Sequence, residues 1–143
     1  MKIKGRFLKF ESIISSNHYF PRNCEIDIPE KMPLLFNFEQ SGLPLGTVTV
    51  ERDNDGLTMT ADIALGAEEL IKAFKDEVGI GGFYNNLKTR TITMMMPSGF
   101  AVIRRIDKCS LKAVALTPSP VDPSFKYDIV YEENLHAEDN KNE

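Results

Sequence analysis

Cysteine and histidine, which often build active sites and metal sites, are scarce in this chain of 143 residues, and tryptophan is absent. Its two cysteines, Cys24 and Cys109, lie far apart in the sequence and neither belongs to a Cys-x-x-Cys pair. With only His18 and His136 as histidines, they form no zinc-binding pattern. We therefore expect no metal site and no cofactor, and we interpret both cysteines as buried free thiols.

Long apolar runs and excess positive charge are also missing. No stretch approaches the roughly 20 apolar residues that a membrane helix needs, and the charged, alternating N-terminus MKIKGRFLKFESII has no secretion-signal pattern. The formal net charge is −4, whereas nucleic-acid binding needs a clustered positive surface. The basic pair Arg104–Arg105 is interpreted as solvated strand positions. We expect a cytoplasmic protein that binds neither membrane nor nucleic acid.

What is present suits one globular domain: 42% of the residues are hydrophobic and 27% are charged. We expect a single domain over residues 1–131, with strands that suit a barrel or a sandwich. Residues 2–10 alternate as a half-buried strand does. Pro29 and Pro33 exclude a helix over residues 24–38 and favour edge strands or loops there. The polar, acidic segment 132–143 has little to bury, so a disordered tail is predicted.

Two hairpins are predicted from alternation and turn residues. Residues 46–65 contain two alternating segments around the turn sequence RDNDG. Residues 87–97 and 100–107 form the second pair, joined by Pro97-Ser98-Gly99. Met94, Met95 and Met96 lie in that pair, and consecutive strand residues point to opposite faces, so they cannot converge on one metal ion. We interpret them as core filling, and we expect residues 111–116 at the centre of a closed sheet.

One helix is predicted near residues 67–79. Its first turn carries Glu68 and Glu69, which suit the positive end of the helix dipole, so we interpret them as a cap and not as an acid–base couple. Gly79 is expected to end the helix in the left-handed conformation. The apolar residues with helical spacing are Leu70, Ile71, Phe74 and Val78.

Three pieces in fixed order resemble the tailed-phage prohead proteases, which are related to the herpesvirus assembly proteases. The first piece, residues 32–63, has Pro33 followed by two leucines, a Pro-x-Gly at Pro44, and an Asp-Gly turn at Asp55. The second is the predicted helix followed by Gly82-Phe83. The third is LKAVALTPSPVDP at residues 111–123, similar to the closing strand and turn of that family. Together they cover roughly residues 30 to 127.

The resemblance implies a mainly β (α+β) fold, namely a compact, mostly antiparallel β-barrel with flanking helices. It would also imply a serine protease, which needs a serine hydroxyl and a nearby imidazole base. The histidine position of the family falls at Phe38. The serine position falls at Ile80, or at Gly81 if the loop differs by one residue. None of these can act, so we expect a non-catalytic member with vestigial site positions.

The resemblance further implies an origin in a phage or prophage, a structural role in capsid assembly, capsid or scaffold proteins as partners, and location in the host cytoplasm or the virion. Self-association as a homodimer is expected because the related proteases commonly pair. Two alternatives stay open. One is an active protease with relocated residues such as His18 with Ser98 or Ser110, although His18 is expected to be solvent-exposed in a loop. The other is a host module that binds a peptide at an exposed strand edge.

Overall fold

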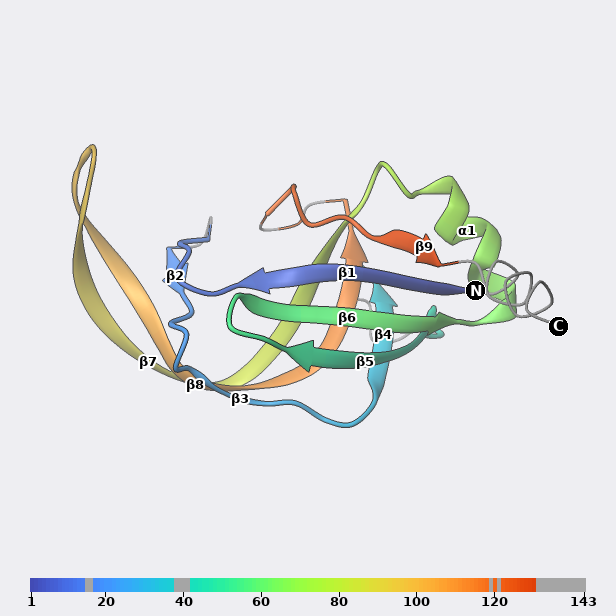
Figure 1. Ribbon diagram of the computed structural model, residues 1–143, viewed down its shortest axis with the longest axis horizontal. Helices are drawn as coiled ribbons and strands as arrows, with labels where there is room; N and C mark the ends of the chain where they lie inside the picture. The colour runs from blue at the N-terminus through green and yellow to red at the C-terminus, as the bar shows by residue number, and fades with distance from the viewer. Residues whose placement is uncertain (15–16, 38–41, 119, 121, 131–143) are drawn as a thin grey trace, which may run out of the picture.

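The computed structural model describes residues 1–14, 17–37, 42–118, 120 and 122–130. This part of the chain is mainly β, with one curled sheet and one short helix (Figure 1), as the sequence predicts. The strands are β1 (Lys2–Lys9), β2 (His18–Tyr19), β3 (Glu25–Asp27), β4 (Met32–Phe36), β5 (Gly46–Arg52), β6 (Gly56–Ile63), β7 (Gly79–Met96), β8 (Gly99–Thr117) and β9 (Asp128–Val130). The predicted acidic tail at 132–143 lies outside the described residues.

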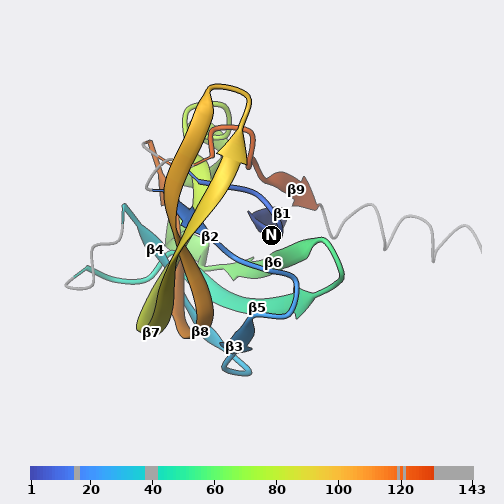
Figure 2. The ribbon, with the colours of Figure 1, turned by 90° about the vertical axis from the view of Figure 1, so that its left-hand side faces the viewer.

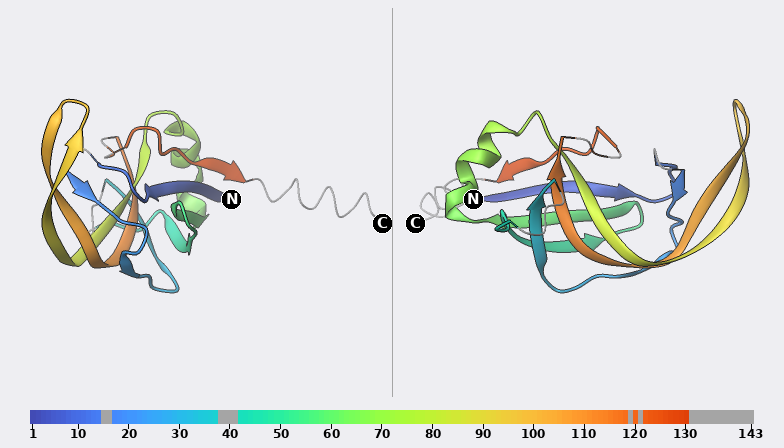
Figure 3. Two further views of the ribbon diagram at one scale, coloured as in Figure 1. Left: turned by 60° about the vertical axis from the view of Figure 1, so that its left-hand side comes forward. Right: turned by 180° about the vertical axis from the view of Figure 1, so that it is seen from behind.

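The sheet order is β2-β8-β4-β5-β6-β1-β9, and β3 and β7 also pair with β8. Strand β8 organises the fold because it is 19 residues long. Along one edge it pairs in parallel with β2, β3 and then β4, and along the other it pairs with β7. The sheet curls until β1 lies against the start of β7 (Figure 3). In the same region the Ile80 N–H of β7 donates a hydrogen bond to the carbonyl of Phe125, which precedes β9, at 2.9 Å.

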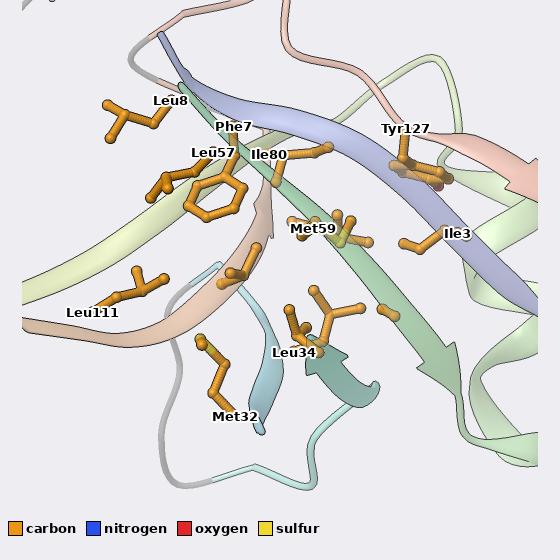
Figure 4. Packing of buried hydrophobic residues seen from close by; sticks show 14 of the residues in the cluster. Ile3, Phe7, Leu8, Met32, Leu34, Leu57, Met59, Ile80, Leu111 and Tyr127 are labelled. Atoms are coloured by element: carbon orange, nitrogen blue, oxygen red, sulfur yellow. The ribbon is translucent and has the colours of Figure 1, made fainter. Parts of the chain in front are cut away.

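The core fills the inside of this curl (Figure 4). Alternation puts one side of each strand inward, and the innermost side chains are completely buried; a buried aliphatic side chain contributes roughly 1.5–3 kcal/mol. Close packing also needs Gly5, because a Cβ there would lie 2.5 Å from Ile80 Cδ1. The residues with 0% exposure include Ile3, Leu34, Val48, Leu57, Met59 and Ile80.

The helix is shorter than the sequence predicts. A 3-10 turn (η1, Leu65–Ala67) leads into α1 (Glu68–Ala73), and the prediction of a helix near 67–79 is therefore wrong in its second half. Gly79 does not end the helix but begins β7, where it pairs with Thr117 of β8. Pairing with β8 and the hydrogen bond from Ile80 to Phe125 draw this segment into the sheet. Tertiary contacts thus override the helical spacing of Val78.

Strand β4 lies inside the sheet, between β5 and β8, so the prediction of edge strands or loops is wrong for it. Its proline is tolerated because Pro33 stands near the start of the strand, where a missing N–H does least harm. Pairing with β8 begins only at the next residue, Leu34. The prediction holds for β3, which among the described strands pairs with β8 alone.

Residues 87–103 form a two-stranded arm that extends from the body of the protein (Figures 1 and 2). Its two strands are the far ends of β7 and β8, which in the described chain pair only with each other beyond the short contact of β2 at Arg104. Met95 is 68% exposed on this arm, so its interpretation as core filling is wrong; Met94 and Met96 are half-buried. Within the described ranges, no helix is long and apolar enough to cross a membrane.

Candidate functional site

The segment Gly79–Tyr84 at the start of β7 contains Ile80 and Gly81, the two positions that the resemblance to the prohead proteases assigns to the nucleophile. Consecutive strand residues face opposite ways, and the two positions accordingly differ. The Ile80 side chain is fully buried in the core, against Gly5 of β1 (Figure 4). Gly81 lines a cavity on the other side of the strand. Phe38, the assigned histidine position, lies outside the described residues.

The cavity beside Gly81 has a volume of about 400 Å³ and lies where the arm joins the body. Its volume falls in the range of small-molecule pockets, and its lining is mostly apolar. No serine, cysteine, lysine, arginine or carboxylate is among the described residues that line it. The aromatic side chains around it are Phe7, Phe20, Phe83, Tyr84 and Phe125, and the other polar lining residues are His18 and Thr117.

His18 reaches this cavity although the sequence predicts it in an exposed loop. It begins β2, pairs in parallel with Arg104 of β8, and is half-buried. The prediction of an exposed loop is wrong because β8 recruits this two-residue strand from a segment without alternation. Thr117 also lines the cavity, and its hydroxyl donates a hydrogen bond to Asn37 Oδ1 at 3.0 Å. No sequence spacing relates His18 to Thr117; only the path of β8 does.

Tyr84 is the third polar residue of the cavity. Its ring packs against Phe20 with centroids 5.1 Å apart and folds back over Gly82, where a Cβ would lie 2.6 Å from the tyrosine oxygen. The hydroxyl is buried and has no hydrogen-bond partner among the described residues. Burial raises the pKa of Tyr84 well above its ordinary value, so the phenol stays protonated and cannot accept a proton as a base. Gly82 is thus a packing requirement of Tyr84.

The two cysteines meet in the core. Both are buried free thiols, as predicted. Their contact is not visible in the sequence, because it follows from the pairing of Ile26 in β3 with Cys109 in β8. The hydrogen bond between the thiols lowers the pKa of Cys24 and raises that of Cys109. Neither thiol lines the cavity, and no cluster of metal ligands occurs among the described residues.

The fold does not bring His18 close to Ser98 or to Ser110, the two serines considered as a relocated nucleophile. Ser98 lies in the turn at the tip of the arm, and Ser110 lies on β8 next to the body. Each is six residues along β8 from Arg104, the partner of His18, which corresponds to about 20 Å of extended strand. The acidic pair Glu68 and Glu69 opens α1, as the cap interpretation predicts.

Comparison of the chain with known protein families, with curated proteins and with solved structures found no match. The site is therefore interpreted from its own geometry. At the start of β7, Ile80 is buried in the core and Gly81 lines a cavity surrounded by aromatic side chains. Such a cavity suits apolar side chains of a ligand or partner better than the polar transition state of a hydrolysis.

Proposed function

We propose that this chain is a non-catalytic protein of phage or prophage origin that acts by binding other proteins during capsid assembly. The observation that carries the proposal is the chemistry of the two assigned nucleophile positions. The Ile80 side chain is completely buried in the core, and Gly81, which lines the cavity, has no side chain. Hydrolysis by a serine protease needs an attacking hydroxyl and a base at hydrogen-bond distance. Neither assigned nucleophile position supplies an attacking atom.

Two of the three polar residues that line the cavity, Thr117 and Tyr84, support the same conclusion. The Thr117 hydroxyl is engaged with Asn37, and the buried Tyr84 phenol keeps its proton. The rest of the described lining is dominated by aromatic and aliphatic side chains. Burying apolar side chains of a partner there would contribute about 25 cal/mol per Å² of apolar surface removed from water.

Capsid assembly as the setting rests on the resemblance of residues 32–63, the Gly82-Phe83 step and residues 111–123 to the prohead proteases. A barrel of the prohead-protease type, in the host cytoplasm or the virion, is part of this proposal. The curled, mainly β sheet supports it at the level of architecture. A fold does not fix a function, so the role needs a direct test.

The absence of catalysis is tested with a fluorophosphonate probe, which reacts covalently with activated serines. We expect no more labelling of the folded protein than of the heat-unfolded protein. A native, active serine protease in the same reaction is the positive control. Labelling that disappears in Ser98→Ala or Ser110→Ala would contradict the proposal, because it would reveal a relocated nucleophile.

The assembly role is tested with the capsid and scaffold proteins encoded near this gene. We expect the purified protein to bind one of them and to change the rate or size of the shells that they form, followed by light scattering and electron microscopy. A gene neighbourhood without terminase, portal or capsid genes would contradict this role.

A peptide-binding module is the second candidate, favoured by the edge of β7 on the arm, which no strand of the described residues pairs with. An extended peptide can add a strand to such an edge. Host genes as neighbours, together with peptide binding that Met95→Pro abolishes, would favour this module over the capsid role. Proline removes a backbone donor that an added strand needs.

A further inference from the structure

We propose that the cavity at the base of the arm binds a small monocarboxylic acid with an apolar body, such as a medium-chain fatty acid. In this arrangement the apolar body lies among the aromatic side chains of the cavity, and the carboxylate binds Arg104, which lines a second cavity beyond His18. The inference goes beyond the proposed function and does not depend on it, because this ligand binds whether or not the protein takes part in capsid assembly.

The cavity is an apolar space beside a close-packed core. Core residues such as Leu57 and Met59 are completely buried, and protein interiors hold few gaps larger than a water molecule. This cavity measures about 400 Å³, at the lower end of the range in which proteins bind small molecules. Phe7 and Phe20 line it together with Ile106, which is 2% exposed. An apolar ligand is expected to fill such a space more favourably than water does.

A second, smaller cavity meets the first at His18. It measures about 250 Å³, and His18 is part of the lining of both. It lies along the arm, because β2 pairs there with β8 and holds His18 beside Arg104 (Figure 1). Its lining includes the polar residues Asn17 and Thr91 as well as Arg104. The two cavities together therefore suit a molecule with one apolar end and one charged end.

The charge at the second cavity is positive. No acidic residue occurs between Glu77 and Asp107, and no carboxylate is among the described residues that line either cavity. Asp107 forms ion pairs with Arg90 and Arg105, at 2.7 and 3.0 Å. Arg104 forms no ion pair with any residue that the structure describes. A guanidinium binds a carboxylate through two parallel hydrogen bonds, so Arg104 suits a carboxylate as the charged end of the ligand.

Two other occupants fit the cavities less well. Aromatic side chains also surround cationic ligands through cation–π contacts, but Arg104 would repel a cation at this place. An apolar side chain of a protein partner fits the first cavity and leaves Arg104 without an anion, unless it belongs to the C-terminal residue of that partner. A peptide C-terminus thus shares the chemistry of the proposed ligand and is a separate arm of the test.

The first test is isothermal titration calorimetry of the full chain with three ligands that share one apolar body: decanoate, 1-decanol and decylammonium. We expect one decanoate to bind per chain. Decanol is expected to bind at least about tenfold more weakly and decylammonium more weakly still, because Arg104 attracts the carboxylate alone. No heat of binding for decanoate, or binding of decylammonium as tight as that of decanoate, would overturn the inference.

The second test changes the two ends of the site. Arg104→Gln is expected to weaken decanoate about tenfold and to leave decanol unchanged, whereas Lys31→Gln, at an exposed position that lines neither cavity, should change neither. Leu87 lines the first cavity and is 46% exposed, so Leu87→Asp places a repelling charge there without opening the core. Leu65→Asp, at an 89% exposed position outside the lining, is its control. Circular dichroism checks that each variant keeps the fold. Equal affinity of Arg104→Gln and Lys31→Gln for decanoate would contradict the assignment of the carboxylate.

The third test locates the ligand and identifies its source. In nuclear magnetic resonance spectra, decanoate is expected to shift the backbone amide signals of His18, Gly81 and Gly82 and to leave that of Thr49 on β5 unchanged. Shifts that spare His18 and both glycines would overturn the inference. An acetylated tripeptide that ends in a free leucine is expected to bind more weakly than decanoate, because its side chain fills less of the cavity. Tighter binding of the peptide would assign the site to the C-terminus of a protein and overturn the small-molecule source.

Discussion

The body of the protein and its arm are built from the same kinds of strand, yet they differ in what covers their apolar residues. In the body, Leu57 and Met59 of β6 are completely buried. In the arm, Met95 and Phe100 occupy equivalent alternating positions and are 68% and 74% exposed. Alternation assigns side chains to a face, but only the curl of the sheet covers that face. In the part of the chain that the structure describes, the arm has two strands and no second layer, so its pattern stabilises the monomer much less.

The largest expected difference between the two regions comes from truncating one side chain in each. Leu57→Ala removes a fully buried side chain and is expected to lower the free energy of unfolding by about 2–5 kcal/mol. Met95→Ala, on the exposed arm, is expected to change it by less than about 0.5 kcal/mol. Urea denaturation of dilute protein measures both. Similar losses in the two variants would show that the arm is covered in the monomer.

A pair of glycines sharpens the comparison. A Cβ at Gly46 in the body would lie 2.1 Å from the Asp62 carbonyl oxygen, so Gly46→Ala must displace β6 and is expected to cost about 1–3 kcal/mol. At Gly99 in the arm no atom lies within 4 Å of the added Cβ. Its φ of +121° strains an alanine there, but the loss cannot exceed the free energy of opening the arm locally. Thermal unfolding should therefore rank Gly46→Ala as the more damaging change.

Two tyrosines provide a smaller contrast, between the body and the base of the arm. The buried Tyr127 hydroxyl donates to the Ile71 carbonyl at 2.5 Å, so Tyr127→Phe is expected to cost about 1–2 kcal/mol. Tyr84→Phe removes a buried hydroxyl without a hydrogen-bond partner among the described residues, so it is expected to be neutral or stabilising. Urea denaturation at neutral pH measures both; a larger loss for Tyr84→Phe would contradict the assignment.

Tyr127 also predicts how the free energy of unfolding changes at alkaline pH. Burial raises the pKa of Tyr127 to about 12, with a smaller contribution from Asp76. The folded-state pKa is above the unfolded value near 10, so the contribution of this group is complete below about pH 10 and is lost as pH rises toward about 12. Tyr127→Phe should flatten that part of the stability profile.

The smallest effect is expected at the β5–β6 turn, on the surface of the body. The Arg6 guanidinium hydrogen-bonds to Asp53 and, with the N–H groups of Asp55 and Gly56, lowers the pKa of Asp53 to about 2. This contribution is present above about pH 4 and is lost as pH falls toward about 2. Asp53→Asn should reduce the acid dependence of stability, measured by urea denaturation between about pH 2 and pH 7.

Local signals predicted several elements correctly. The strand over residues 2–10 and the hairpin over 46–65 carry alternation and, in the hairpin, an Asp-Gly turn, and both are present with small differences in length. The helix was predicted too long because residues 74–78 keep helical spacing while β8 draws Gly79 into the sheet. The cavity could not be predicted, since its residues come from β1, β2, β7, β8 and the segment at Phe125, and no spacing in the sequence relates them.

The sequence by itself determined that the chain is mainly β, where its hairpin turns fall, and that Ile80 and Gly81 offer no nucleophile. Those properties depend on alternation, turn residues and side-chain chemistry, which are local. The tertiary structure alone decided that β8 pairs with four other described strands, that His18 and Thr117 share a cavity, and that the methionines of β7 lie on an exposed arm. These properties depend on sheet curvature and long-range pairing, because the same alternating pattern is buried where the sheet curls and exposed where only two strands continue.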